Sequence, residues 1–187
     1  MSDKKVILIL SGQAQLEGGP AVEKFAKKAA RANAYQGGDL KALVEANGQA
    51  VFAAPEEIKD QFDKGAAFVC VESSDDEAAM AAAAAAMDRR TLIIWVGSES
   101  ARFGGFGTKK GGETDRDVFA RDILPTINYL ADVPLTDDVD GAIIYQVLKD
   151  VNLKAKEISR LNDAVARMEA AMERAEGHDP WKKHDCS

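Results

Sequence analysis

The feature that most constrains this chain is an alternation of short apolar runs with helical patterns. Continuous apolar runs occupy residues 6–10, 66–71 and 91–96, and small or polar residues follow each of them. Runs of this length and composition are typical of parallel strands that are buried on both faces. Residues 50–54 resemble a further strand. Because helical patterns separate the runs, we predict an α/β fold with a predominantly parallel sheet and helices on both faces.

Start signals place helices between these strands. Pro20 is a favourable first helical residue, and the helical pattern that it opens continues to Ala32. Asp39 is expected to cap a second helix. Ser74, with Glu77 three residues later, has the spacing of a capping box and predicts a helix that runs to residue 89 or 90.

The segment after the 91–96 run changes character. Residues 97–112 are rich in glycine and predict a long mobile loop, which can wrap an anion with its backbone amides and lysines but lacks the order of a phosphate-binding loop. Residues 114–121 and 122–131 predict two helices, the second interrupted by Pro125. We therefore assign residues 1–149 to one α/β domain.

Residues 150–176 predict a long amphipathic helix that follows the domain. Its apolar residues recur at alternating intervals of three and four, which is the pattern of a coiled-coil seam. The seam consists of Ile158, Leu161, Val165, Met168 and Met172. The helix can pack on its own domain or pair with another chain, and we expect the latter because the stripe is narrow and its flanks are charged. Residues 177–187 form a polar tail.

Charge and composition exclude several classes of function. The net charge of −7 argues against nucleic acid as a partner, because neutralising phosphates requires a basic surface. No stretch reaches the length of about 20 apolar residues needed to span a membrane. The two cysteines make no disulfide framework, and the apolar run at residues 6–10 is too short for a secretion signal. We therefore expect a cytoplasmic protein without a membrane partner.

Several segments resemble the alkaline phosphatase superfamily, which includes sulfatases and cofactor-independent phosphoglycerate mutases. Residues 122–127 (DILPTI) are similar to a helix of that family, and the chain then runs to Asp140-Gly141 much as the family does. Residues 91–96 are similar to its penultimate strand, residues 68–77 to an earlier strand and helix start, and residues 6–12 to its first strand. The resemblance implies an alkaline phosphatase-like core, shorter than is usual for the family.

The departures concern the two metals that the family binds through Asp and His. Ser11 stands where the first strand carries a metal-binding Asp, and Met80 or a neighbouring alanine stands where a His is expected. Ser98 and Glu99 occupy the places of an Asp-His pair, and Phe106 that of a further His. No histidine precedes residue 178, whereas imidazole is the usual nitrogen ligand of zinc. The resemblance thus implies a relative that has lost the family's chemistry and has no cofactor.

Polar residues at the predicted strand ends could still form a site. The candidate pocket residues are Ser11, Gly12, Asp75, Asp76, Ser98 and Glu99. Their three carboxylates and two hydroxyls could hold Mg²⁺ or Ca²⁺ through oxygen. Alternatively, Ser74, Asp75 and Asp76 serve only to cap a helix, while Ser98 and Glu99 begin a solvated loop. In the tail, His178, His184 and Cys186 could bind a metal, although their spacing fits no standard zinc module.

The sequence therefore predicts a non-catalytic α/β binding or interaction module that forms homo-oligomers through its C-terminal helix. A small anionic molecule is a further candidate partner. The alternative is a small metal-dependent hydrolase of phosphate or sulfate esters, with oxygen ligands at the strand ends. A third reading is that the sheet edge binds a small ligand without turning it over.

Overall fold

The computed structural model describes residues 3–177 and divides the chain into two units, Met1–Asp150 and Val151–Ser187. The first unit is built on a six-stranded sheet with the order β2-β7-β6-β1-β5-β4. Strands β1, β4, β5 and β6 are mutually parallel, while β7 runs antiparallel to β6 and β2 antiparallel to β7. The predicted α/β fold with a mostly parallel sheet is therefore confirmed.

The strands of the first unit include a small second sheet made of β3 and β8. The strands are β1 (Lys5–Ser11), β2 (Ala30–Ala32), β3 (Tyr35–Gln36), β4 (Val51–Phe52), β5 (Phe68–Ser73), β6 (Thr91–Val96), β7 (Ala101–Gly105) and β8 (Val118–Phe119). The helices are α1 (Pro20–Lys28), α2 (Leu40–Asn47), α3 (Ile58–Asp63), α4 (Asp76–Ala86) and α5 (Ala120–Ala131), with 3-10 turns η1 (Pro55–Glu57) and η2 (Tyr145–Val147).

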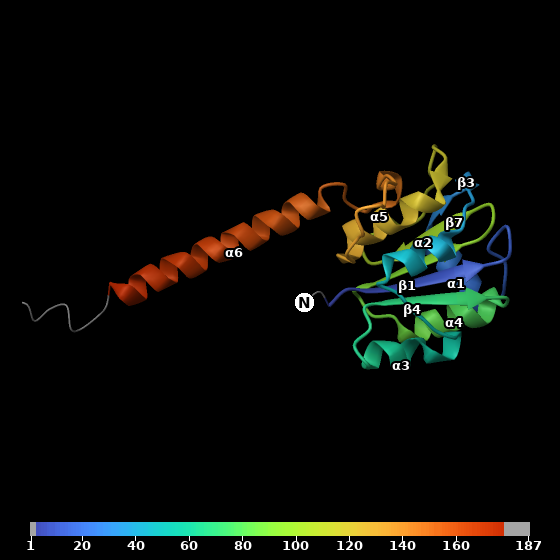
Figure 1. Cartoon of the computed structure of the whole chain (residues 1–187), viewed down its shortest axis with the longest axis horizontal. Helices are drawn as coiled ribbons and strands as arrows, with labels where there is room; N and C mark the ends of the chain where they lie inside the picture. Colours follow the sequence, from blue (N-terminus) through green and yellow to red (C-terminus); the bar gives the residue numbers. More distant parts are fainter. Residues whose placement is uncertain (1–2, 178–187) are drawn as a thin grey trace, which may run out of the picture. The chain divides into compact units, whose positions relative to one another are not determined.

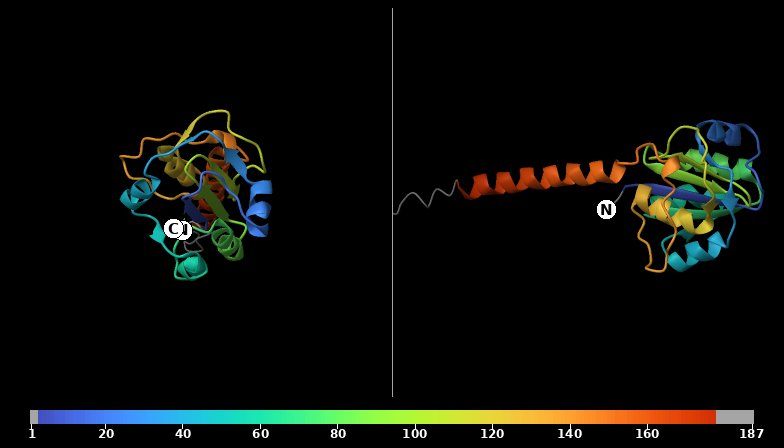
Figure 2. Two further views of the ribbon diagram at one scale, coloured as in Figure 1. Left: turned by 90° about the vertical axis from the view of Figure 1, so that its right-hand side faces the viewer. Right: turned by 90° about the horizontal axis from the view of Figure 1, so that it is seen from above.

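Helices cover both faces of the large sheet (Figure 1). Helices α1, α3 and α4 lie on one face and α2 and α5 on the other, as the end-on view in Figure 2 also shows. Strand β1 lies at the centre, where Ile9 pairs in register with Val71 of β5 and Trp95 of β6. These three side chains are fully buried and belong to the core beneath α1, α3 and α4. Their neighbours in sequence alternate to the opposite face, because successive side chains of a strand point to opposite sides.

Three local predictions were wrong. The helix that begins at Pro20 ends at Lys28 rather than Ala32, because Ala30–Ala32 pairs with β7 as an edge strand. The expected mobile loop at residues 97–112 contains β7, whose fully buried Phe103 pairs with Ile94 of β6. Residues 114–121 hold β8 and only the start of α5. In each case the pairing of strands outweighed the local sequence signal for a helix or a loop.

Residues 122–127, at the start of α5, are held by a cluster of hydrogen bonds. Asp122, almost completely buried, accepts hydrogen bonds from the backbone N–H groups of Phe119 and Ala142 at 3.0 and 2.9 Å. Its carboxylate also pairs with Arg116 at 3.3 Å. The hydroxyl of Thr126 accepts from the Ile144 N–H at 3.0 Å. The helix and the Asp140-Gly141 segment are thus joined directly, and each side chain has a structural role in that junction.

The second unit contains α6 (Leu153–Glu176), a helix of 24 residues. None of its residues is buried. Within residues 3–177, no helix combines the length and the apolar character that crossing a bilayer requires.

Candidate functional site

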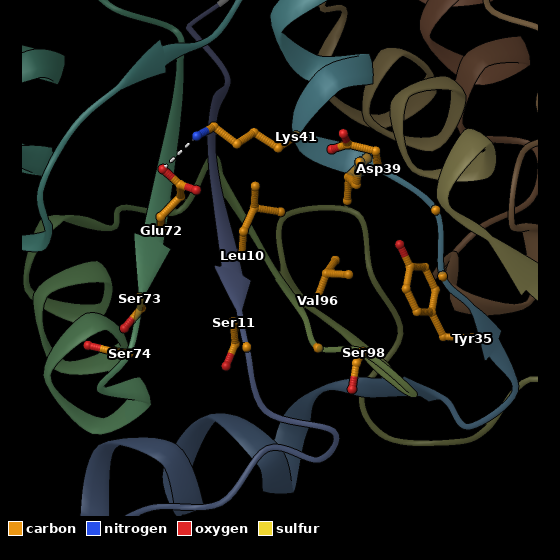
Figure 3. A pocket seen from close by; sticks show the side chains of 15 residues that line it. Leu10, Ser11, Tyr35, Asp39, Lys41, Glu72, Ser73, Ser74, Val96 and Ser98 are labelled. Atoms are coloured by element: carbon orange, nitrogen blue, oxygen red, sulfur yellow. Dashed lines mark ion pairs between the residues drawn. The ribbon is translucent and has the colours of Figure 1, made fainter.

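A cavity of about 590 Å³ opens at the carboxyl ends of the central strands β1, β5 and β6 (Figure 3). Ligands of open α/β sheets bind at this edge, beside the strand from which neighbouring connections diverge. The segment that leads from β3 into α2 forms the remaining wall. The lining comprises Leu10, Ser11, Gly12, Tyr35, Gly37, Gly38, Asp39, Leu40, Lys41, Glu72, Ser73, Ser74, Val96, Gly97 and Ser98.

The pairing of the strands explains the mixed character of the lining. Leu10 is in register with Glu72 of β5 and with Val96 of β6, so all three lie on the same face of the sheet. This is the face that α2 and α5 cover. Leu10 and Val96 provide an apolar floor, and Glu72 is the single charged side chain that a core strand contributes to the cavity. One residue further, Ser11 of β1 is level with Ser73 of β5.

The hydroxyl of Ser11 forms a hydrogen bond with the beginning of α4. Its Oγ donates to Asp76 Oδ2 at 3.1 Å and accepts from the Gln13 N–H at 3.2 Å. Asp76 is only 2% exposed, and its Oδ1 has no hydrogen-bond partner among the described residues. The Ser11–Asp76 pair therefore has the geometry of a structural bond between β1 and α4.

The acidic run before α4 acts in helix capping, though with a different pattern from the predicted capping box. Asp75 is the N-cap and accepts from the Ala78 N–H at 3.1 Å, while Ser73 Oγ bonds the backbone of Asp75. Glu77 instead accepts from the N–H groups of Ala21 and Val22 at 2.8 and 3.1 Å. It thereby caps α1, whose own N-cap, a glycine, has no side chain for this purpose.

The wall formed by residues 35–41 brings three polar side chains to the cavity, those of Tyr35, Asp39 and Lys41. Lys41 reaches from α2 to Glu72 on β5, where the two charged groups are 3.1 Å apart (Figure 3). The hydrogen bond to Glu72 raises the pKa of Lys41. Burial raises the pKa of Tyr35 to about 12, so its phenol is neutral at physiological pH and can both donate and accept.

The six residues predicted for this site separate into two groups. Ser11, Gly12 and Ser98 line the cavity, whereas Asp75, Asp76 and Glu99 are not part of its lining. Asp75 caps a helix and Asp76 is buried behind Ser11. Over residues 3–177, no group of three or more His, Cys, Asp or Glu side chains is placed to hold a metal ion. The tail residues His178, His184 and Cys186 lie outside the described part of the chain.

Sequence reasoning missed the side chains that residues 35–41 and 72–74 supply. Tyr35, Lys41, Glu72, Ser73 and Ser74 all line the cavity. One signal was available, since Glu72 directly follows four buried apolar residues of the same strand. The contribution of Tyr35 and Lys41 depends on how α2 folds back over the sheet, which no local pattern encodes.

A second candidate site is the apolar stripe of α6. Ile158, Leu161, Val165, Met168 and Met172 are between 51% and 65% exposed. They are the five residues predicted for an interface.

Comparisons with models of known protein families, with curated proteins and with solved structures gave no match to this chain.

Proposed function

We propose that the protein is a non-catalytic, homo-oligomeric binding module. In this proposal α6 joins copies of the chain, and the α/β domain, a shortened relative of the alkaline phosphatase superfamily, presents the strand-end cavity to a small polar molecule. The exposed stripe of α6 is the observation that carries the proposal.

The stripe is costly to leave in water. Burying a large apolar side chain completely is worth about 1.5–3 kcal/mol, and five such side chains stand half exposed or more along one line of α6. A helix that buries none of its residues has little stability beyond its intrinsic propensity, because helices in proteins gain most of their stability from packing. A partner that covers the stripe adds the free energy of packing that the isolated helix lacks.

The sequence of α6 favours a second copy of itself as that partner. Ile158 and Val165 occupy one seam position and Leu161 the other, and β-branched residues alternating with leucine in this way favour two-stranded coiled coils. The helix carries five basic and five acidic side chains, so its net charge is zero although the chain carries −7. Two copies of α6 can therefore approach without net repulsion.

Sedimentation equilibrium of the full chain tests this assignment. We expect the wild type to sediment as a dimer or larger species and the double variant Leu161→Asp/Val165→Asp to sediment as a monomer. The matched control is Ala166→Asp/Ala170→Asp, which adds the same charges away from the seam and should leave the oligomer intact. A wild type that is monomeric at high concentration would contradict the proposal.

For the cavity, the lining favours a neutral polar ligand over the small anion that the sequence suggested. It holds one basic side chain, Lys41, against the carboxylates of Asp39 and Glu72. The other polar groups are serine hydroxyls, the Tyr35 phenol and the backbone of glycines, which suit hydroxyl groups of a sugar or polyol.

Thermal denaturation with matched sugars and sugar phosphates distinguishes the two ligand classes. A sugar at 100 times its Kd should stabilise the domain by about 2.7 kcal/mol. Ser98→Tyr, which fills the mouth of the cavity, should abolish the shift, whereas Glu99→Tyr, next to the cavity, should not. Stabilisation by the phosphates alone would overturn the preference for a neutral ligand.

The hydrolase alternative receives less support from the positions of its candidate ligands. It requires Asp75, Asp76 and Glu99 to share a metal ion, yet Asp75 caps α4, Asp76 bonds Ser11, and none of the three lines the cavity. We expect no turnover of generic phosphate or sulfate esters with Zn²⁺, Mn²⁺ or Mg²⁺. Turnover that is lost when these three residues become alanine would overturn the non-catalytic assignment.

A further inference from the structure

A second cavity lies away from the strand ends, in a crevice of about 460 Å³ between α1 and α4. Its floor is formed by Ile93 of β6 and the two glycines of β7, Gly104 and Gly105. Its apolar walls come from Phe25 of α1 and from Met80, Ala84 and Met87 at α4. The volume lies within the range of small-molecule sites, and the walls share no residue with the strand-end cavity.

The local sequence keeps this crevice open. A β-carbon at Gly104 would approach the ring of Phe25 to 2.5 Å, so only glycine lets that ring lie against the sheet here. The α4 helix ends in three alanines, Ala84 to Ala86, whose small side chains leave space beside the helix. Met87 is a large apolar side chain that stays 41% exposed beside the opening. Methionine side chains are flexible and adapt to ligands of irregular shape.

Three lysines surround this apolar space. Lys24 and Lys28 are one helical turn apart on α1, and Lys110 joins them from the loop after β7. Within residues 3–177, no carboxylate lies within ion-pair distance of these three ammonium groups. The chain carries a net charge of −7, yet all the charged side chains that line this crevice are basic. The crevice thus combines an apolar interior with a cationic rim.

We propose that this crevice binds a free single-chain amphiphile with an anionic head group, such as a medium-chain carboxylate. The alkyl chain packs against Phe25, Met80 and Met87, while the carboxylate pairs with the lysines at the rim. A sugar or other fully polar molecule would leave the apolar walls uncovered. A neutral alkane would leave the lysines unpaired. The inference is independent of the strand-end cavity and of α6.

Methyl NMR of the full chain with ¹³C-methyl methionine locates the binding. The chain has five methionines, and Met80 and Met87 line the crevice, whereas Met168 and Met172 lie on the α6 stripe. Decanoate, added below the concentration at which it forms micelles, should shift the signals of Met80 and Met87 and leave those of Met168 and Met172 in place. Shifts confined to the α6 methionines would overturn the proposal.

Chain length and head group test the two halves of the site separately. Each buried methylene should tighten binding about fourfold, so decanoate should bind about fifteenfold more tightly than octanoate. Decanol and decyltrimethylammonium should bind at least tenfold more weakly than decanoate. Equal binding of decanoate and decanol would contradict the role of the lysines. Methionine shifts produced by phosphatidylglycerol vesicles but not by monomeric decanoate would contradict a free amphiphile as the ligand.

Two pairs of variants complete the test. Ala84→Trp fills the crevice and should abolish binding, whereas Ala85→Trp, at the next exposed position of α4, should leave the Kd within twofold. Lys24→Glu/Lys28→Glu should weaken decanoate binding at least tenfold, and Lys27→Glu, which lies outside the lining, should weaken it less than threefold. Because all five positions are exposed, the variants should fold. Decanoate binding that survives Ala84→Trp would place the ligand elsewhere and refute the assignment.

Discussion

The α/β domain and the α6 helix have similar amphipathic patterns but very different burial. In the domain, the apolar side chains of the amphipathic helices, such as Leu40 and Val44 of α2 and Ile127 of α5, are almost inaccessible to water. In α6, Leu161 and Met168 are each 65% exposed, although their spacing is as regular as that of any core helix. The difference teaches that periodicity identifies a face that must be covered but not what covers it. The domain supplies its own partners, and in our proposal α6 finds them in another copy.

The largest expected effect tests whether the domain is as closely packed as this comparison assumes. A β-carbon at Gly141 would overlap the carbonyl oxygen of Arg121 in the backbone of α5. Gly141→Val should therefore prevent the domain from folding, as judged by loss of its cooperative urea transition. Gly12→Ala is the control, since nothing lies within 4 Å of its added methyl group. A Gly141→Val domain of wild-type stability would show that this junction is loose.

The next effect concerns the buried carboxylate that joins α5 to the segment after Gly141. Asp122→Ala removes the acceptor of two backbone N–H groups and the partner of Arg116. The Arg116 side chain is 36% exposed, so the main cost is that of two backbone N–H groups left without an acceptor. At about 1–3 kcal/mol for each group, we expect the free energy of unfolding in urea to fall by about 2–5 kcal/mol. Asp117→Ala, at an exposed position five residues earlier, should change it by less than about 0.5 kcal/mol. Equal effects of the two substitutions would contradict the role of Asp122.

Alkaline pH should destabilise the domain through two buried groups. Burial raises the pKa of the Cys70 thiol from 9.0 to about 12 and that of Tyr35 from 10.0 to about 12. Because both folded-state pKa values are raised, each contribution is complete below the ordinary pKa of its group and is lost above it, from pH 9 for Cys70 and from pH 10 for Tyr35 up to about pH 12, by about 1.4 kcal/mol per pH unit.

Urea titrations between pH 8 and pH 12 measure this loss of stability. Cys70→Ala should flatten the first part of the profile and Tyr35→Phe the part above pH 10. A profile that neither substitution alters would show that these groups are not buried as described.

The smallest effect is expected at the surface of the domain. A hydrogen bond from Lys5 lowers the pKa of Asp88, so its contribution to stability is present above the ordinary pKa near 4 and is lost as the pH falls through the lowered value. The side chains of Lys5 and Asp88 are 32% and 50% exposed, and ion pairs at the surface contribute at most about 1 kcal/mol. Asp88→Asn should lower the urea midpoint slightly at pH 7 and not at all at pH 2. A loss of stability as large as that expected for Asp122→Ala would contradict the expected difference between the buried carboxylate and this surface ion pair.

The sequence predicted those parts of the fold that depend on local patterns. The apolar runs located β1, β5 and β6, because strands buried on both faces need continuous apolar side chains. It did not reveal β7, since Gly104 and Gly105 are required there by contacts with Phe25 and with the backbone of Thr91. Such contacts between distant segments override the loop signal of glycine.

The residues of the candidate site were likewise predictable only where they follow from local patterns. Ser11, Gly12 and Ser98 could be placed because the ends of parallel strands meet at one edge of a sheet. Tyr35 and Lys41 could not, since a separate helix carries them to that edge. Glu77 was assigned to its own helix, but the structure shows that it caps α1 through space.

Far-UV circular dichroism on dilution tests the central claim, that α6 owes its stability to other copies of the chain, most directly. We predict that the helical signal falls on dilution by up to the share of the 24 residues of α6, while the near-UV signal of the domain, to which buried Trp95 contributes, stays unchanged. Ala166→Asp/Ala170→Asp should show the same dilution curve as the wild type. A chain that is monomeric by sedimentation and yet retains its full helical signal would contradict the account.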